Sequence, residues 1–335
     1  VIGKGMNPPQ KILFPPEKIC MDWRQKRRPG AGLYNLGSTC YLNVVLQCLT
    51  YTPPLANYLL SRQHSRFYRL SPQCSFQGCL FFIISVLSQL CQASLAGALS
   101  QEELLTSFVV IGDFNADIPG DAYEFLRCTL SAMQAACLSG TTNVDASSEE
   151  TTIIHQIFGG FLRSRVRCLR CKGVSDFFKV FLDVLLKIKG TLSLTTALEH
   201  FVAPKHLEGK RAFKCSKCKK RVAASKVVTI HQAPRILTVC LGRADDQTSR
   251  KLSQVVIYPE YLNLRPYMSE PAGKALLYTL YAVVVHTGPS CLGGHFLCYT
   301  KASNDQWYKM NDVSVESCDI RTVLEQQAYL LFYAR

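Results

Sequence analysis

Four cysteines of this sequence fall into two pairs with the spacing of metal ligands. Cys168 and Cys171 form one Cys-x-x-Cys pair, and Cys215 and Cys218 form the other. A two-residue gap lets both sulfurs of a turn face one ion, and four thiolates are the ligand set of a closed structural zinc site. The 43 residues between the pairs exceed the roughly 15–20 of a single zinc ribbon. We therefore expect the pairs at the tips of two separate hairpins that lie side by side.

A fifth cysteine, Cys40, stands where a nucleophile can be activated. It follows Gly37-Ser38-Thr39 and opens a predicted amphipathic helix, for which Ser38 or Thr39 is available as the N-cap. The N-terminus of that helix favours a thiolate over a thiol. Asn35 lies five residues upstream in a glycine-flanked loop, from which its amide can point at an oxyanion formed when Cys40 attacks a carbonyl.

A thiolate nucleophile needs an imidazole, and His295 is the strongest of the seven histidines. Two glycines precede it, and the strand predicted after it pairs with a return strand over residues 306–310. If the midpoint of this hairpin lies between residues 303 and 304, His295 lies beside Asn311 and Asp312. A carbonyl or carboxylate there would orient the imidazole ring. The chain order Cys, His, Asn/Asp is that of papain-like proteases.

The elements that must position these residues change in character along the chain. A helix is predicted from Cys40 until Pro53-Pro54 stops it, and a second helix begins at Asp121. After about residue 153 short alternating or β-branched runs predict strands, interrupted by a short helix near residues 195–202. The predicted strands cover residues 161–166, 177–188, 227–230, 236–241, 278–285, 296–300, 306–310 and 328–333. Helices followed by strands predict an α+β fold with an antiparallel sheet.

Composition excludes several classes of protein. With 335 residues, 48% of them hydrophobic, the chain can bury a large core and is not a disordered protein. Its 16 cysteines lie far apart, which excludes a small disulfide scaffold and indicates thiols in a reducing, intracellular compartment, nuclear or cytoplasmic. The first residues resemble neither a signal peptide nor a transit peptide, and we expect a domain of a longer protein.

Charge and hydropathy set two further expectations. The formal net charge of +14 favours acidic partners such as nucleic acid, anionic lipid or an acidic protein. Residues 70–101 carry no charge and are nominally long enough to span a membrane, but serine and glutamine interrupt their apolar residues. We expect buried helices there and no membrane partner.

Three stretches of the chain resemble motifs of the ubiquitin-specific protease family. Residues 32–47, Gly-Leu-Tyr-Asn-Leu-Gly-Ser-Thr-Cys-Tyr-Leu-Asn-Val-Val-Leu-Gln, resemble the family's cysteine box. Residues 281–288 with Gly-Gly-His-Phe at 293–296, and then Trp-Tyr-Lys-Met-Asn-Asp at 307–312, resemble its histidine box. Both Cys-x-x-Cys pairs fall where the fingers of this family hold zinc.

The resemblance implies a papain-like cysteine protease with a right-hand architecture, acting as a monomer on ubiquitin and ubiquitinated proteins with one structural zinc and no organic cofactor. The resemblance covers about residues 31–335 and implies a thumb over about 31–150, fingers over about 155–235 and a palm over about 236–335. The prolines and basic residues of positions 1–30 predict an extended basic arm before it, with a solvated leader as the alternative. For catalysis the resemblance implies Cys40 as the nucleophile, His295 as the base, and Asn311 as the residue that orients the ring, with Asp312 as its polar neighbour. It places Asn35 near the oxyanion. For substrate binding it implies that Phe296 narrows the channel for ubiquitin's Gly-Gly tail and that Asp121 and Glu124 meet ubiquitin's basic tail.

Departures from the family pattern leave two other functions open. Residues 119–125 lack both glutamines of the family's Gln-Gln-Asp-Ala-His-Glu-Phe, and residues 241–244 are Leu-Gly-Arg-Ala where Leu-Lys-Arg-Phe is usual. They favour, as one alternative, a ubiquitin-binding protein with weakened catalysis. Basic residues around both cysteine pairs favour, as another, a zinc-dependent nucleic-acid binder; the same charges are also typical of a solvated finger surface.

Overall fold

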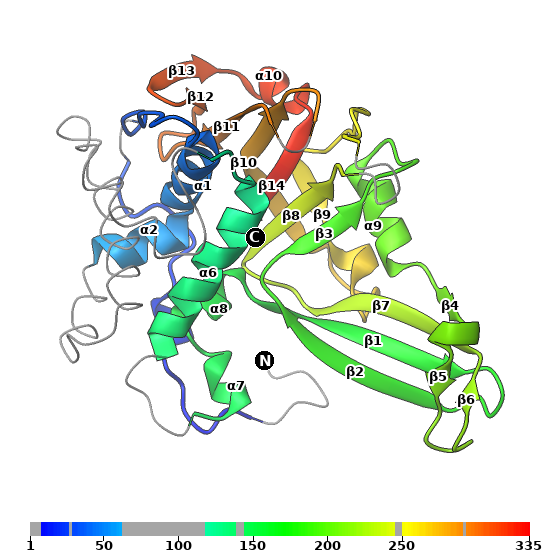
Figure 1. Cartoon of the computed structure of the whole chain (residues 1–335). Coiled ribbons are helices and arrows are strands. Elements are labelled where there is room, and N and C mark those ends of the chain that lie inside the picture. Colours follow the sequence, from blue (N-terminus) through cyan, green and yellow to red (C-terminus); the bar gives the residue numbers. More distant parts are fainter. Residues whose placement is uncertain (1–7, 27–28, 62–117, 139–143, 245–249, 291–292) are drawn as a thin grey trace.

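The structure is a computed structural model of the whole chain, and it describes residues 8–26, 29–61, 118–138, 144–244, 250–290 and 293–335. Most helices gather on one side of the molecule, and the strands form a large sheet and a long projecting sheet (Figure 1). The uncharged run at residues 70–101 lies within the undescribed segment 62–117, so the expectation of buried helices there lies outside the described residues. Within the described part of the chain, no helix is long and apolar enough to cross a membrane.

The helical side of the molecule is built around α1, in which every residue is buried. Its elements are η1 (Pro16–Lys18), α1 (Cys40–Thr50), α2 (Pro53–Leu60), α6 (Ala122–Leu138), α7 (Ala146–Glu149) and α8 (Ile153–Phe158). The first helix ends before Pro53-Pro54 as predicted, but the two prolines then begin α2 rather than ending helical structure. Proline suits the first turn of a helix because the missing N–H would have no partner there.

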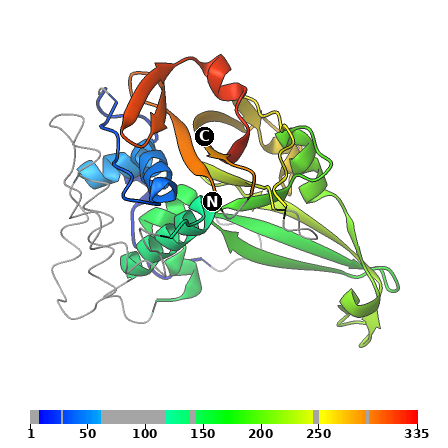
Figure 2. The ribbon, with the colours of Figure 1, turned by 45° about the horizontal axis from the view of Figure 1, so that its top comes forward.

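The projecting sheet forms the fingers, with the strand order β2-β1-β7-β4 among the described residues. Its strands are β1 (Gly160–Cys168), β2 (Val174–Phe181), β4 (Lys205–Leu207) and β7 (Ala224–Gln232). A small separate hairpin of β5 (Phe213–Lys214) and β6 (Arg221–Val222) lies at its far end, as both ribbon views show (Figures 1 and 2).

The larger sheet forms the palm, with the strand order β13-β12-β11-β10-β14-β8-β3 and β9 paired to β10. Its strands are β3 (Val184–Lys187), β8 (Ile236–Gly242), β9 (Tyr261–Asn263), β10 (Leu277–Thr287), β11 (His295–Lys301), β12 (Trp307–Asn311), β13 (Ser314–Cys318) and β14 (Ala328–Ala334). The remaining helical elements are α9 (Leu194–Val202), η2 (Gly209–Arg211), η3 (Arg265–Tyr267) and α10 (Ile320–Leu324). The helix predicted near residues 195–202 is therefore confirmed as α9.

Two features of the palm sheet differ from the sequence prediction. The run predicted as one strand over residues 177–188 is divided into β2 of the fingers and β3 of the palm. β3 also pairs parallel to β8, so the palm sheet is not wholly antiparallel. β3 belongs to the palm sheet, although its residues fall inside the range expected for the fingers. The exact boundaries between thumb, fingers and palm stay a prediction.

The palm sheet is buried on both faces, which explains its almost continuous apolar strands. Val284 and Leu330 pack with the helices in one core cluster. Val283 and Leu331 pack with α9 and η3 in the other. Successive residues of a strand point to opposite faces, so β10 and β14 feed both clusters. This sheet is a rigid platform on which the last strands can carry a site.

The described part of the N-terminal arm packs on the helical side. Phe14 is buried, its amide donates to the carbonyl of Thr151 at 3.1 Å, and its ring lies 5.5 Å from the ring of Tyr58. The alternative of a solvated leader is therefore wrong at Phe14. Its apolar ring is buried against the helices instead of facing water. The carbonyl of Thr151 that Phe14 meets lies just after α7.

Candidate active site

Cys40 is the first residue of α1 and is buried. The expected side-chain cap is absent, because Thr39 stands at the N-cap but its hydroxyl accepts from the amide of Leu36 at 2.9 Å. Asn35 Oδ1 accepts instead from the amide of Thr39 at 3.2 Å. These two bonds hold the loop before the helix and leave the first-turn amides of α1 without a side-chain cap. That free helix N-terminus faces the charge that Cys40 develops as a thiolate.

Burial raises the pKa of the Cys40 thiol, and the backbone amide of Phe296 opposes this shift. The negative charge of Asp312 raises the same pKa further. Without a nearby base the thiol would therefore stay protonated. The site needs an imidazole to remove the proton.

His295 meets its expected partner, with its Nε2 atom 2.6 Å from Oδ1 of Asn311. The second expected partner is farther away, since Oδ2 of Asp312 lies 3.8 Å from the same nitrogen. Because an amide oxygen only accepts, Nε2–H donates to Asn311 and Nδ1 keeps its lone pair.

The hairpin that brings His295 to Asn311 has a different register from the predicted one. Lys301 pairs with Trp307, which centres the hairpin on Asn304 rather than between residues 303 and 304. The cause is a three-residue loop in which Asp305 takes a left-handed conformation, with a φ of 64°. This register makes Asn311 the diagonal neighbour of His295 on the same face of the sheet, within side-chain reach. The predicted register would have placed Asp312 opposite the ring and Asn311 on the other face.

Asp312 connects the histidine hairpin to the loop and helix of Cys40. Its Oδ1 accepts from Asn43 Nδ2 at 2.8 Å, and its Oδ2 accepts from Asn35 Nδ2 at 3.1 Å. Its carbonyl accepts from the amide of Leu33 at 2.8 Å. The backbone before Leu33 and the backbone after Asp312 lie so close together that a Cβ on Gly32 would be 2.3 Å from the carbonyl oxygen of Val313. Sequence reasoning gave no role to Asn43, although it stands within the cysteine-box motif.

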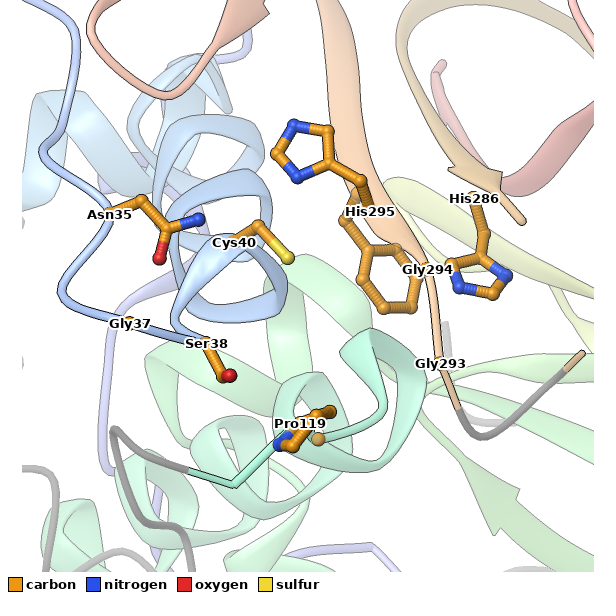
Figure 3. A pocket seen from close by; sticks show the side chains of 11 residues that line it. Asn35, Gly37, Ser38, Cys40, Pro119, His286, Gly293, Gly294 and His295 are labelled. Carbon is orange, nitrogen blue, oxygen red and sulfur yellow. The ribbon is translucent and has the colours of Figure 1, made fainter.

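Three of the catalytic candidates line one pocket of about 140 Å³ between α1 and β11, and Asn311 and Asp312 stand behind His295 without lining it. Asn35, Cys40 and His295 all face it, and Figure 3 shows Asn35 and His295 on either side of the Cys40 side chain. The structure thus brings together residues from the two ends of the chain, as predicted. The pocket is further lined by Gly37, Ser38, Pro119, Gly120, His286, Gly293, Gly294 and Phe296.

His286 is a pocket residue that sequence reasoning did not single out. Its ring centroid lies 4.4 Å from that of Phe296, which is itself buried. Burial, with the charge of Lys251, lowers the pKa of His286 to about 4. The imidazole is therefore neutral near pH 7 and forms part of an uncharged wall with Phe296. Its place five residues after Tyr281 in the histidine-box motif was the available signal.

Asp121 and Glu124, the two acidic residues expected to meet a basic tail, differ in how firmly their side chains are held. Asp121 is held at the start of α6, where its Oδ1 accepts from the amide of Glu124 at 2.9 Å and its Oδ2 accepts from the hydroxyl of Tyr329 at 2.7 Å. Glu124 is exposed. Asp121 can therefore present its charge only in one fixed orientation, beside the pocket that its neighbour Gly120 lines.

Gly120 and Arg243 lie within the two stretches that depart from the family pattern, and Arg243 itself matches the arginine of that pattern. A Cβ on Gly120 would lie 2.7 Å from the ring of Tyr41, so a side chain there would displace that ring. Arg243 is only 4% exposed. Its Nε donates to the carbonyl of Ala328 at 2.8 Å, and its Nη1 donates to the carbonyls of Leu252 and Gln254, each at 2.9 Å. Arg243 is thus a buried structural cation of the palm.

The four paired cysteines converge at the far end of the fingers, with all four sulfurs within 4.8 Å of one another. One pair sits where β1 turns into β2 and the other sits between β5 and β6, which confirms two neighbouring hairpins. Cross-pair distances are 3.8 Å for Cys168 to Cys218 and 3.6 Å for Cys171 to Cys215.

Both turns have the same local geometry, which fits a thiolate-bound metal ion. The amide of Cys171 donates to the sulfur of Cys168 at 3.4 Å, and the amide of Cys218 donates to that of Cys215 at 3.4 Å. These amides lower the pKa of both accepting thiols, that of Cys168 to about 6. Four soft ligands at such spacing can hold one tetrahedral ion and leave no position open for chemistry.

A helix-borne cysteine, a histidine on a neighbouring strand and an asparagine that orients it define the site of a papain-like cysteine protease. Here the site stands on a fold with a palm and with fingers that carry a four-cysteine cluster. The family described as ubiquitin carboxyl-terminal hydrolase matches residues 31–333, and the chain belongs to this family. The resemblance drawn from the cysteine and histidine boxes is therefore confirmed.

Among curated relatives, the chain is 51% identical to human ubiquitin carboxyl-terminal hydrolase 42, over 100% of this chain and 25% of that protein. It is 44% identical to human ubiquitin carboxyl-terminal hydrolase 17-like protein 20, over 97% of this chain and 60% of that protein. The chain thus spans only part of the length of these relatives.

Among solved structures, the chain is similar to the SAGA DUB module of Ubp8, Sgf11, Sus1 and Sgf73 bound to monoubiquitin. The TM-score is 0.79 at 27% identity, over 98% of this chain and 71% of the other. The same module bound to ubiquitin aldehyde gives a TM-score of 0.79 at 27% identity, over 95% of this chain and 72% of the other. The right-hand fold expected from the sequence is confirmed.

Proposed function

We propose that this chain is a deubiquitinase, which hydrolyses isopeptide or peptide bonds at the C-terminal glycine of ubiquitin. One observation carries the proposal: the His295 ring is held 2.6 Å from Asn311 in a pocket that it shares with Cys40. Membership of the ubiquitin carboxyl-terminal hydrolase family supports ubiquitin as the substrate, as do the related structures bound to monoubiquitin and ubiquitin aldehyde.

The chemistry follows from the hydrogen bond that fixes the imidazole. Because Nε2–H donates to Asn311, Nδ1 is the basic atom and takes the proton of Cys40. The Cys40 sulfur attacks the glycine carbonyl, and the new carbon–sulfur bond places a negative charge on the carbonyl oxygen. The amine leaves with the proton carried by His295. Water, deprotonated by the same ring, then hydrolyses the thioester and releases ubiquitin.

Asn35 and the start of α1 stabilise the oxyanion in this proposal. Asn35 donates one amide N–H to Asp312, and its side-chain oxygen accepts a hydrogen bond from the amide of Thr39. These two bonds fix the orientation of the side chain. The second amide proton remains for the oxyanion, together with the uncapped amides of the helix. Asp312 is then a positioning residue. Phe296 and His286 form the uncharged wall that admits a glycine tail, and Asp121 and Glu124 attract its basic residues.

We also propose that the metal of the fingers is zinc, held by Cys168, Cys171, Cys215 and Cys218 in a structural role. Four thiolates are the ligands that zinc prefers, and they stabilise the fingers without taking part in the reaction. The described cysteines are all free thiols, which supports an intracellular location where thiols stay reduced.

Hydrolysis of ubiquitin carrying a fluorescent amide at its C-terminus tests the function. We expect turnover by the wild type and none by Cys40→Ala, with ubiquitin binding retained by both proteins. The alternative of a ubiquitin-binding protein with weakened catalysis predicts binding without turnover in the wild type. Turnover that persists in Cys40→Ala would overturn the assignment of the nucleophile.

A further inference from the structure

The far end of the fingers carries a concentration of positive charge that the proposed hydrolysis does not use. It consists of residues 167–173 and 209–223, which together hold ten lysines and arginines and neither aspartate nor glutamate. All ten basic residues are exposed. We call this surface the finger-tip cluster. Both ribbon views place it at the end of the projecting sheet, away from α1 and the candidate active site (Figures 1 and 2).

The two segments form one surface because the metal-ligand set holds them together. Their four cysteine sulfurs lie within 4.8 Å of one another, and the amide of Leu169 donates to the carbonyl of Ala223 at 3.0 Å. The side chain of Lys217 also approaches Gly173, where a Cβ would lie 3.2 Å from its Cδ. Charges that are distant in sequence therefore add in space.

Little of this charge is neutralised nearby. Elsewhere in the fingers, Arg165 is paired with both carboxylate oxygens of Asp176, at 2.8 and 2.6 Å, and Arg163 donates to the carbonyl of Ser269 at 3.2 Å. No ion pair joins the finger-tip cluster to any other described residue. A zinc ion with four thiolates would carry a net charge of about −2, which offsets only a small part of ten cations.

An exposed aromatic ring lies beside these charges. Phe177 of β2 is 51% exposed, and its ring centroid lies 6.5 Å from that of Phe213 in an edge-to-face arrangement. Phe213 is followed by Lys214, which pairs across the hairpin with Arg221. An aromatic face next to cations is the combination that binds unpaired bases and phosphates together. A duplex or an acidic peptide would use the cations but leave the ring unused.

We propose that the finger-tip cluster binds single-stranded nucleic acid. Its lysines and arginines contact the phosphates, and an unpaired base stacks on Phe177. The surface is separate from the pocket of Cys40, so the deubiquitinase can hold a strand of RNA or single-stranded DNA while its active site stays open.

Fluorescence anisotropy with labelled oligonucleotides, across a range of salt concentrations, tests the proposal. The variant Arg170→Gln/Lys214→Gln/Lys220→Gln changes three exposed side chains of the finger-tip cluster. We expect it to weaken binding about tenfold or more and to reduce the slope of log K against log salt by about 2. Phe177→Leu is expected to weaken binding while leaving that slope unchanged, because stacking releases no counterions.

A matched control removes the same charge elsewhere. Lys18, Lys274 and Arg321 are exposed and lie outside the fingers, so Lys18→Gln/Lys274→Gln/Arg321→Gln should bind like the wild type. Metal content and thermal unfolding confirm that each variant keeps its fingers. Uridine and deoxythymidine 12-mers distinguish RNA from DNA, and binding of either supports the proposal. Equal weakening by both triple variants, equal competition by duplex DNA, or tighter binding to phosphatidylserine vesicles would overturn it.

Discussion

Asn43 donates a hydrogen bond from its side-chain amide to Asp312 at 2.8 Å, which joins α1, the helix that Cys40 begins, to the residue that follows the hairpin of His295. The two residues are 269 positions apart in the sequence. With the bonds from Asn35 and Leu33, this contact fixes the distance between the two halves of the site. A catalytic pair that is split between distant chain segments depends on such a connection, because small displacements reduce proton transfer steeply.

Substitution of Asp312 is therefore expected to slow catalysis without removing any group that reacts. Asp312→Ala loses both side-chain bonds, and we expect kcat/KM to fall about 100-fold. Asp312→Asn keeps one acceptor for Asn43 and should lose about tenfold. Steady-state hydrolysis of fluorogenic ubiquitin measures both. Equal activity in Asp312→Ala and the wild type would show that Asp312 does not position the site.

Asp312 also affects the ionisation of Cys40, and alkylation detects this effect directly. Its negative charge raises the pKa of the Cys40 thiol. Removing that charge in Asp312→Asn should lower this pKa, so the pH profile for the reaction of Cys40 with iodoacetamide should move to lower pH. Mass spectrometry of the Cys40 peptide gives the rate at each pH. An unchanged profile, or one displaced to higher pH, would be inconsistent with this electrostatic account.

Much of the site could be predicted from sequence because its chemistry is encoded locally. A two-residue spacing is enough to define a metal-binding turn such as that of Cys168 and Cys171, and both predicted hairpins are present. Cys40 begins α1 as expected because the apolar spacing that follows it is helical. His295 could be selected among the histidines by its glycines and its strand.

The features that sequence reasoning got wrong depend on contacts between distant residues or on the conformation of one residue. The hairpin register depends on the left-handed φ of Asp305, which no residue pattern required. Pairing of β3 with β8 joins residues 55 positions apart, such as Val184 and Val239, so strand-by-strand patterns cannot show it. Sequence reasoning made no prediction about the burial of Arg243, which depends on carbonyls from Leu252, Gln254 and Ala328 that only the fold brings together.

Metal removal is expected to unfold the fingers rather than to abolish chemistry at Cys40 directly. Cys168→Ser removes one of four ligands, and we expect loss of the bound metal with a fall in Tm of about 5–10 °C. Cys318→Ser is the matched control, since Cys318 is a free thiol of β13 outside the cluster. Calorimetry and metal analysis compare the two variants. A Cys168→Ser protein with stoichiometric zinc and unchanged Tm would show that the four-thiolate site is wrongly assigned.

Gly294 is expected to tolerate no side chain, because it is both left-handed and crowded. Its φ is +135°, and a Cβ would lie 2.0 Å from the carbonyl oxygen of Thr287. Gly294→Ala must force β10 and β11 apart next to His295, so we expect a loss of about 3 kcal/mol in unfolding free energy and of most turnover.

Substitution of Gly273 serves as the control, because it introduces backbone strain without a steric clash. Its φ is +119°, but no atom lies within 4 Å of a Cβ placed there. Gly273→Ala should cost only about 1 kcal/mol and leave turnover unchanged. Urea denaturation and kcat report on both variants, and equal effects would mean that the approach of Thr287 is unimportant.

The most direct measurement of the central claim is labelling by ubiquitin that carries an electrophile at its C-terminus, followed by peptide mapping. The account predicts one covalent adduct, on Cys40, that forms quickly in the wild type, slowly in His295→Ala and not at all in Cys40→Ala. A folded, metal-loaded wild type that remains unlabelled, or an adduct on any other of the 16 cysteines, would contradict it.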